Sequence, residues 1–456
     1  MINEIVLINP AYDYPVTKRK EAFRWNRTWP PLDLANSAAL LEKHGFEVSI
    51  IDANADRLAP RDVTQKIKNF DKIFITSGSL DRWQCPHLDI RTFLETVKAI
   101  KETGSEIYVM GPHGTFRPKE ILKMTKVNHI IVGEPELTIL DICKSKNPEK
   151  IQGLYFIKNR KTFFKPRKKF LDLNSLPIPS FNLLPMGKYF YEILGDHFNL
   201  FEASRGCPYS CTFCAANQMY GKSYRIKKAE NLIKEIEYSI ENFGVKAAYF
   251  IDLEFTLNNR LNRENVEKIC NILIEKKLDF KWCCQTRADS IDCGLLKKMK
   301  LAGCELIHFG VESGSERILK SIDKKITLSR IENAIKMTKK IGIKTACFFI
   351  FGLPDETVED MMRTVKFAKR INPTFASFNI ATPYPNTVFY EKVKEEISEL
   401  FPAYYDGILK VGDLKKLTNH ALKQFYLRPL YLLQKIISEN PKDLKKQFDL
   451  FRKFLK

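Results

Sequence analysis

The feature that most constrains the fold is an alternation of short apolar runs and helix-length segments from residue 4 to about residue 143. The runs are nearly continuous, which is typical of strands buried on both faces of a parallel sheet. They are IVLIN (5–9), EVSIID (47–52), KIFITS (72–77), EIYVMG (106–111) and HIIVG (129–133). The pattern predicts an α/β fold, with a Rossmann-like domain over residues 1–145 that binds its ligand beyond the carboxyl ends of the strands.

The alternation stops between residues 146 and 195. The stretch GLYFIKNRKTFFKP (153–166) is typical of a β-hairpin, and LDLNSLPIPSFNLLP (171–185) is punctuated by proline and has no helical period. We interpret residues 146–195 as a hairpin and proline-rich linker between two domains.

A second alternation follows, with six strands expected near 199–204, 247–252, 280–286, 305–311, 345–351 and 375–381. Helix-length segments separate them. Six such units predict a partial (β/α)6 TIM-like barrel over residues 196–395, with its active site at the carboxyl ends of the strands.

Residues 396–456 are predicted to form a basic helical C-terminal region. From residue 410 onward there are twelve Lys or Arg and four Asp or Glu, and Leu422, Phe425, Tyr426, Leu430 and Leu433 recur at helical spacing. A packing helix is the ordinary interpretation, and a peripheral membrane contact or a partner surface is the alternative. The formal charge of +20 permits attraction to phosphates, anionic lipids or acidic proteins. Because nucleic-acid-binding signatures are missing, no nucleic-acid partner is expected.

The eleven cysteines are scattered and odd in number. The N-terminal MINEIVLINP is too short in its apolar part for a secretory signal or a membrane span. A cytoplasmic chain with reduced thiols is therefore expected.

Three cysteines fall in one short loop, SRGCPYSCTFC (204–214), directly after the first strand of the second series. Thiolates suit iron–sulfur clusters, and the absence of a nearby fourth cysteine would leave one iron of a cubane open to a ligand. Structural zinc usually needs paired ligands in two groups, and only His197 lies near the loop in sequence. Simple burial of small apolar residues does not suit a loop so rich in Gly, Pro and polar residues.

The spacing of Cys207, Cys211 and Cys214, with Phe213 before the last cysteine, resembles the signature of the radical S-adenosylmethionine enzymes. The resemblance continues to about residue 390 through four strand-end motifs: YFIDLEFT (249–256), CQTRAD (284–289), HFGVESGSERIL (308–319) and FFIFGLPDET (348–357). It implies that the three cysteines hold a 4Fe–4S cluster whose open iron chelates S-adenosylmethionine.

The same resemblance assigns further cofactor contacts. The backbone at Phe213 would meet the adenine, and Glu312 and Ser313 would lie on the ribose or methionine side. Arg287 would neutralise the methionine carboxylate. Either Asp252 or Glu254 would meet the methionine ammonium.

The first domain has no Gly-rich dinucleotide or phosphate loop after any expected strand. Its loops TSGSLDRW (76–83), GPHGTFRP (111–118) and GEPE (133–136) instead resemble those of the cobalamin-binding domain found before many such barrels. By that resemblance the cobalamin site is lined by Ser77, Ser79, Gly111, His113, Thr115, Gly133 and Glu134. The loop after the first strand contains no histidine, so a protein imidazole below the cobalt is not expected, and we interpret His113 as a hydrogen-bonding residue. The aromatic and basic loop from 11 to 31 would cover the cofactor, or simply pack on the surface.

The chain thus resembles the cobalamin-dependent (class B) radical S-adenosylmethionine methyltransferases and the related anaerobic cyclases. The resemblance implies radical methyl transfer to an unactivated carbon or a phosphorus of a small-molecule or lipid-like intermediate, with electrons from a flavodoxin or ferredoxin. The alternatives are a cobalamin-dependent cyclisation, rearrangement or hydration without methylation, and a metal-binding regulatory protein without turnover. The residues that act directly on the substrate are not identified by the sequence.

Overall fold

The computed structural model describes residues 4–12, 28–67, 70–83, 85–145, 147–397, 401 and 405–438. The chain forms two compact units. The first comprises Met1–Pro208, Cys214–Phe255 and Asn259–Cys284, and the second comprises Tyr209–Phe213, Thr256–Asn258 and Gln285–Lys456. The domain boundaries at 145, 195 and 395 remain predictions, since these units follow a different division.

The first unit contains a seven-stranded sheet in the order β2-β1-β3-β4-β5-β6-β7. Its strands are β1 (Ile5–Asn9), β2 (Val48–Asp52), β3 (Lys72–Thr76), β4 (Glu106–Met110), β5 (His129–Ile131), β6 (Leu154–Lys158) and β7 (Lys161–Phe164). The first five are parallel, as predicted for the Rossmann-like domain. The hairpin β6–β7, which the sequence analysis assigned to the linker, adds antiparallel to β5, with Ile130 opposite Tyr155.

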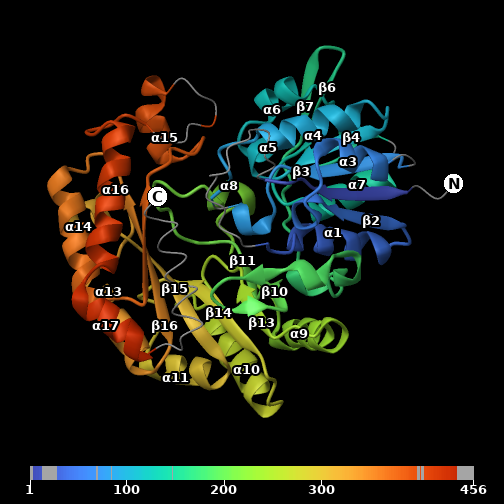
Figure 1. Ribbon diagram of the computed structural model, residues 1–456. Helices are drawn as coiled ribbons and strands as arrows, with labels where there is room; N and C mark the ends of the chain where they lie inside the picture. Colours follow the sequence, from blue (N-terminus) through green and yellow to red (C-terminus); the bar gives the residue numbers. More distant parts are fainter. Residues whose placement is uncertain are drawn as a thin grey trace. The chain divides into compact units, whose positions relative to one another are not determined.

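Helices cover both faces of this sheet (Figure 1). They are α1 (Leu32–Glu42), α2 (Ala53–Asp56), α3 (Pro60–Lys66), α4 (Arg91–Lys101), α5 (Pro112–Phe116), α6 (Pro118–Thr125) and α7 (Glu136–Lys144). Alternate side chains of each parallel strand point to opposite faces. One set, represented by Leu7, Phe74 and Tyr108, packs with Leu34 of α1 and Ile139 of α7 in a single core cluster. This burial on both faces explains the continuous apolar runs.

The rest of the first unit holds the beginning of the second β/α series, up to Cys284 within β14. Its strands are β8 (Phe190–Tyr191), β9 (Gly195–Asp196), β10 (Phe198–Phe201), β11 (Ser204–Arg205), β12 (Arg225–Ile226), β13 (Ala247–Phe250) and β14 (Lys281–Thr286), and its helices are α8 (Ala216–Tyr220), α9 (Ala229–Phe243) and α10 (Arg260–Glu275). β13 pairs in parallel with β10 and with β14. Helix α9 buries Leu232 and Ile236 and ends at Gly244, whose φ of +63° suits a glycine cap.

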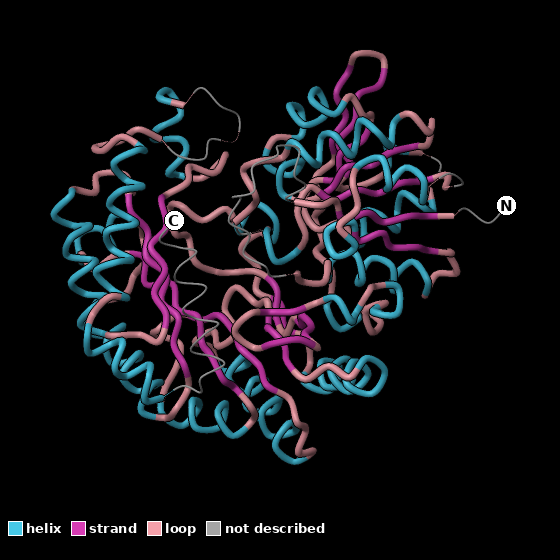
Figure 2. Tube along the Cα trace, in the orientation of Figure 1, coloured by secondary structure: helices cyan, strands magenta, loops and turns pink. Residues whose placement is uncertain are grey.

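The second unit contains three parallel strands, β15 (Cys304–Glu312), β16 (Lys344–Phe351) and β17 (Phe375–Ile380). Figure 2 shows these strands side by side with helices along them. Helices α13 (Leu328–Lys340) and α14 (Val358–Ile371) contact β16, and α16 (Val411–Tyr426) contacts β17. The remaining helices are α11 (Cys293–Leu301), α12 (Glu316–Ser321), α15 (Val388–Val393) and α17 (Pro429–Ser438). All six strands predicted between residues 199 and 381 are therefore present, and the predicted fold class is confirmed.

The C-terminal helices divide the apolar stripe that the sequence shows. Leu422 and Phe425 are buried, whereas Leu430 and Leu433 are exposed by 65% and 53%. The packing interpretation thus holds for the first half of the stripe only. Residues 439–456 of the predicted C-terminal region lie outside the described residues. In the described part of the chain, no helix combines the length and the apolar character needed to cross a bilayer.

Candidate functional site

The loop with the three cysteines begins with a fixed backbone. Strand β11 pairs antiparallel with β12, placing Ser204 opposite Ile226. Gly206 follows with a φ of +101°, and a Cβ at this position would lie 1.9 Å from the carbonyl oxygen of Ser223. Only glycine fits such a close approach in this backbone region. The backbone conformation directly before Cys207 is therefore fixed by the β11–β12 pairing and by the close contact at Gly206.

Cys207, Cys211 and Cys214 are each half-buried. The segment around Cys211 is held from both sides within the second unit, because Thr212 N donates to Ile322 O at 3.1 Å and Phe389 N donates to Thr212 O at 2.9 Å. Among the described residues, no group of three or more His, Cys, Asp or Glu side chains is arranged to hold a metal ion. Cysteine thiolates suit an iron–sulfur cluster, whereas structural zinc usually takes four protein ligands. The assignment of the cluster to these cysteines remains a prediction.

Asp252 lies after β13 and is 2% exposed. Its Oδ2 accepts a hydrogen bond from Ala203 N at 3.1 Å, and its Oδ1 accepts one from the Ser204 hydroxyl. Burial raises the pKa of Asp252 to about 7, although both hydrogen bonds act to lower it. Both carboxylate oxygens are thus engaged with the chain that leads into the cysteine loop. Glu254 is also buried, and its carbonyl oxygen accepts a hydrogen bond from Tyr224 Oη at 2.7 Å.

The residues predicted on the methionine side belong to the second unit. Arg287 is buried, and its guanidinium lies 4.0 Å from the ring centroid of Tyr209, inside the cysteine loop. It donates to Asp289 Oδ1 and Oδ2 at 2.9 and 2.8 Å and to Lys324 O at 2.8 Å. Its charge is therefore already shared with Asp289. The two hydrogen bonds to Asp289 fix the plane of the guanidinium, one face of which lies over the Tyr209 ring.

Glu312 ends β15 with a φ of +66°, beside a register shift between Gly310 and Glu312. Its Oε1 accepts from the buried Lys324 Nζ at 2.8 Å. Burial alone would lower the pKa of Lys324, but the charge of Glu312 raises it above its usual value. Ser313 is fully buried, with its Oγ 3.2 Å from Thr364 Oγ1. Lys324 was not identified from the sequence, because nothing local marks it as the partner of Glu312. Phe213 is half-buried, and its assignment to the adenine of S-adenosylmethionine remains a prediction.

The loops predicted to line the cobalamin site are tied to one another. Gly133 N donates to Thr115 Oγ1 at 2.9 Å, and the Thr115 hydroxyl donates to Gly111 O at 3.0 Å. Gly111 has a φ of +95°, and a Cβ there would lie 3.0 Å from Ser77 N. A Cβ on Gly133 would meet only Met219 O, at 3.8 Å. The backbone thus stays open beside Gly133, and these loops fit a flat cofactor that needs close backbone approach.

His113 is buried in the same group of loops. Its backbone N–H donates to Ser77 Oγ at 3.3 Å, and its Nε2 lies 2.5 Å from His87 O. Burial lowers the pKa of His113 to about 4, so the ring is neutral at neutral pH. Because a carbonyl oxygen only accepts, Nε2 carries the proton. Ser79 N donates to Tyr12 Oη at 3.1 Å, and the two hydroxyl oxygens are 3.0 Å apart. Residues 13–27 of the loop expected to cover the cofactor lie outside the described residues.

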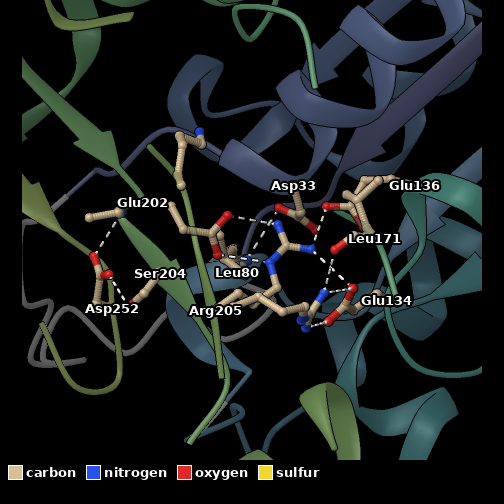
Figure 3. A network of polar contacts seen from close by, with 12 residues as sticks. Asp33, Leu80, Glu134, Glu136, Leu171, Glu202, Ser204, Arg205 and Asp252 are labelled. Atoms are coloured by element: carbon tan, nitrogen blue, oxygen red, sulfur yellow. Dashed lines mark hydrogen bonds and ion pairs between the residues drawn. The ribbon is translucent and has the colours of Figure 1, made fainter. Parts of the chain in front are cut away.

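A buried ion network joins the β5 loop to the cysteine loop within the first unit (Figure 3). Arg205 is 1% exposed, and its Nε and Nη2 donate to Glu202 at 2.8 and 2.9 Å. Its Nη1 lies 2.8 Å from Glu136 Oε1 and 3.5 Å from Glu134 Oε2. Arg225 also contacts Glu134 through both terminal nitrogens, with Nη1 2.9 Å from Oε2. Glu134, predicted to line the cobalamin site, is therefore held by two arginines.

Asp33 on α1 lies next to this network and is fully buried. Its Oδ1 accepts from Leu80 N at 3.2 Å. Burial, with a smaller contribution from the nearby charge of Glu136, raises the pKa of Asp33 to about 8. Burial also raises the pKa of Glu136, against the attraction of Arg205. Asp33 is thus mostly protonated at pH 7, which leaves three glutamates facing two arginines.

The sequence analysis missed Arg205, Arg225, Glu136 and Glu202. A signal was present, because an arginine directly precedes the glycine of the cysteine loop and a second acid ends GEPE. The spacing along the chain, however, does not reveal that these charges meet.

Comparisons with known proteins find both expected cofactor domains in this chain. The family model of the radical SAM superfamily matches residues 201–368, and that of the B12 binding domain matches residues 25–142. An uncharacterized methyltransferase of Pyrococcus horikoshii is 32% identical over 437 residues, covering 91% of each chain. The anaerobic magnesium-protoporphyrin IX monomethyl ester cyclase of Cereibacter sphaeroides is 25% identical over 88% of this chain and 68% of its own length. The solved structure of the cobalamin-dependent S-adenosylmethionine radical enzyme OxsB, with aqua-cobalamin and S-adenosylmethionine bound, covers 99% of this chain and 71% of that chain with a TM-score of 0.77 at 18% identity, which establishes a shared fold.

Proposed function

Because the chain belongs to the cobalamin-dependent radical S-adenosylmethionine methyltransferases, we propose that it methylates an unactivated carbon, or a phosphorus, of a small-molecule intermediate. The observation that carries the proposal is the near-full-length similarity to a methyltransferase, with both cofactor domains in the same order in one chain. The chain uses a 4Fe–4S cluster, S-adenosylmethionine and cobalamin. When bound, the cluster and S-adenosylmethionine supply a hydrogen-abstracting radical, and cobalamin carries the methyl group.

The protein residues hold and orient these groups. Cys207, Cys211 and Cys214 supply the thiolates for the cluster. Asp252 keeps the start of the cysteine loop in place through Ala203 and Ser204. Either Asp252 or Glu254 would meet the methionine ammonium.

In the second unit, Arg287 and the Glu312–Lys324 pair would supply polar contacts to S-adenosylmethionine. Arg287 keeps its orientation through Asp289 and Tyr209. In the first domain, Ser77, Ser79, Gly111, Thr115 and Gly133 present backbone and hydroxyl groups to cobalamin. The neutral His113 stabilises that loop through His87, and Glu134 contributes through its backbone, since its carboxylate faces Arg205 and Arg225.

The test uses the full chain, reconstituted anaerobically with iron, sulfide and cobalamin. With dithionite and S-adenosylmethionine labelled in the methyl group, we expect 5′-deoxyadenosine to form and the label to reach cobalamin and then a candidate substrate. The variant Cys211→Ala should abolish 5′-deoxyadenosine formation, whereas Cys293→Ala, which changes an exposed cysteine outside the loop, should not. A product without the label would refute methyl transfer. Absence of 5′-deoxyadenosine would refute the radical mechanism.

A second candidate reaction is a cobalamin-dependent cyclisation or hydration without methylation. The similarity to the cyclase over most of the chain favours it as the alternative. Product mass separates the two reactions, because methylation adds a methylene unit, whereas cyclisation removes hydrogen and hydration adds water.

The required electrons come from a donor protein, for which we propose an acidic flavodoxin or ferredoxin, because the chain carries a net charge of +20. Reduction of the cluster by either donor should weaken steeply with added salt. A rate that does not depend on ionic strength would argue against charge-guided docking.

We further propose that α17 contacts an anionic membrane surface, from which a lipid-like substrate would be reached. Leu430, Leu433 and Ile437 lie along one side of this helix, exposed by 65%, 53% and 76%, in a region rich in lysine. Sedimentation of the full chain with phosphatidylcholine vesicles, with and without phosphatidylglycerol, tests the contact. Serine at all three positions should abolish binding to the anionic vesicles, and the exposed Leu261→Ser and Leu301→Ser pair is the control. Equal binding by both variants would refute it.

A further inference from the structure

The ion network around Arg205 connects two loops that serve different cofactors in the proposed function. Glu134 belongs to the loop after β5, beside Gly133 of the predicted cobalamin site, and Glu136 is the first residue of α7, which follows that loop. A single residue, Gly206, separates Arg205 from Cys207, and a side chain at Gly206 would collide with the backbone. The residues of this contact, Glu134, Glu136 and Arg205, all lie in the first unit together with Cys207, whereas Tyr209–Phe213 of the cysteine loop belong to the second unit. A movement of Arg205 relative to Glu134 and Glu136 would break the contact.

The contact is rigid for three reasons. The side chains of Arg205 and Glu136 are both 0% exposed, and the side chain of Glu202 is 2% exposed. The two-pronged contact with Glu202 fixes the plane of the guanidinium, and Nη1 lies 2.8 Å from Glu136 Oε1 in an ion pair that lacks hydrogen-bond geometry. The ring of Trp83, which is fully buried, lies 5.8 Å from the guanidinium carbon on the side of the β3 loop. This is a cation–π arrangement, so the Trp83 ring also favours the present position of the guanidinium.

The network is also reinforced at its other end. Arg225 stands opposite Arg205 in the β11–β12 pair, and it donates to both Glu134 Oε2 and Leu171 O at 2.9 Å. Arg205 of β11 and Arg225 of β12 therefore both bind Glu134 of the loop after β5. A buried ion pair is seldom more stabilising than apolar packing of the same volume, so stability alone does not account for such an arrangement. What it provides is a fixed register between the two loops.

We propose that Arg205 is a positioning residue shared by the two cofactor sites, and that through Glu134 and Glu136 it makes cobalamin binding and cluster assembly energetically dependent on each other. The inference rests on the proposed function, because it takes the two loops to be the cobalamin and cluster loops. Coupling between two binding sites is reciprocal: if the cluster strengthens cobalamin binding, cobalamin stabilises the cluster by the same factor. A purely structural ion pair would lower the stability of the chain when broken, but it would not make one cofactor's affinity depend on the other.

The experiment measures the dissociation constant of cobalamin by absorbance titration, in full-length protein with and without the reconstituted cluster. In the unmodified chain we expect the two values to differ by at least about fivefold, the lower end of ordinary site-to-site coupling. In Glu136→Gln the difference should fall below about twofold, because the neutral amide keeps the shape but loses the charge that holds Arg205. Arg205→Lys, which keeps the charge but not the fork, should give an intermediate ratio.

Glu235→Gln is the matched control. Glu235 is equally buried in the same unit and pairs with Lys227 at 2.7 Å, but it belongs to α9 and to neither loop. This variant should keep the fivefold difference even if its stability falls. The midpoint potential of the cluster, followed by electron paramagnetic resonance, gives a second readout, and cobalamin should shift it in the unmodified chain and in Glu235→Gln but not in Glu136→Gln.

Equal cobalamin affinities with and without the cluster in the unmodified chain would overturn the inference and leave the proposed function intact. The same holds if Glu136→Gln keeps the full coupling, or if Glu235→Gln loses as much of it as Glu136→Gln. Failure of the unmodified chain to bind cobalamin or to assemble the cluster would overturn both the inference and the proposed function.

Discussion

Replacement of Asp33 by asparagine should make the first unit more stable, and increasingly so as the pH rises. Asp33 is fully buried, and burial raises its pKa from the ordinary value of 3.8 to about 8. In the unfolded chain the carboxyl group loses its proton near pH 4, whereas in the folded chain it keeps it until about pH 8. The stabilising effect of the buried neutral acid is therefore complete below about pH 4 and is lost as the pH rises toward 8.

The size of the effect follows from the difference in bound protons. Between these two pKa values the folded state holds one proton more than the unfolded state, so the free energy of unfolding falls by about 1.4 kcal/mol per pH unit. At pH 7 the accumulated loss is about 4 kcal/mol. Asparagine does not titrate, and its side-chain oxygen can still accept from Leu80 N. The variant should thus match the parent near pH 4 and exceed it by several kcal/mol at pH 7.

Urea denaturation between pH 5 and pH 8 measures the difference. Three of the four tryptophans, Trp29, Trp83 and Trp282, are described, and all three belong to the first unit, so their fluorescence reports the unfolding of that unit. The exposed Asp279→Asn is the control and should give a difference that does not change with pH. If the gain from Asp33→Asn is the same at pH 5 and pH 7, Asp33 is not protonated in the folded chain and the reasoning fails.

Two further predictions concern the surroundings of the cysteine loop. Gly206→Ala would place a Cβ 1.9 Å from Ser223 O in a backbone with a φ of +101°, so the iron content after anaerobic reconstitution should fall several-fold. Gly187→Ala is the control and should incorporate iron normally, because a Cβ there would meet no atom within 4 Å. Equal iron contents in the two variants would contradict the close approach at Gly206. Lys227→Met would leave the buried Glu235 without its cation and should lower the free energy of unfolding by about 3–5 kcal/mol in urea denaturation, most of which the double variant with Glu235→Leu should restore. An unchanged unfolding midpoint in the single variant would refute the importance of that pair.

The strands were predictable because their physical cause is local. A strand buried on both faces must be apolar at every position, and β1, β3 and β16 each show this in consecutive residues. The polar strand-end loops then fall at the carboxyl ends of the parallel strands by geometry alone. This is why Ser77, Gly111 and Gly133 could be assigned to one edge of the sheet before the structure was known.

The hairpin and the linker were less predictable, because their partners are distant in sequence. Nothing in LYFIK indicates that β6 extends the first sheet beside β5. In the linker, Tyr189 Oη donates to the buried Asp52 Oδ2 at 2.7 Å, although the composition of that segment suggests a solvated connector. Proline prevents regular structure, but it does not prevent packing.

Glu134 shows most clearly what the sequence leaves open. Its place after Gly133 made it a cobalamin contact by resemblance, and its position at the strand end agrees with that. In the structure its carboxylate binds Arg205 and Arg225, so it could turn toward a cofactor only by leaving the buried Arg205 and the half-buried Arg225 short of an acid. Such an exchange is unfavourable in a buried environment. The side chain is therefore better suited to holding the two loops in register than to binding the cofactor, and the loop backbone is left to make that contact.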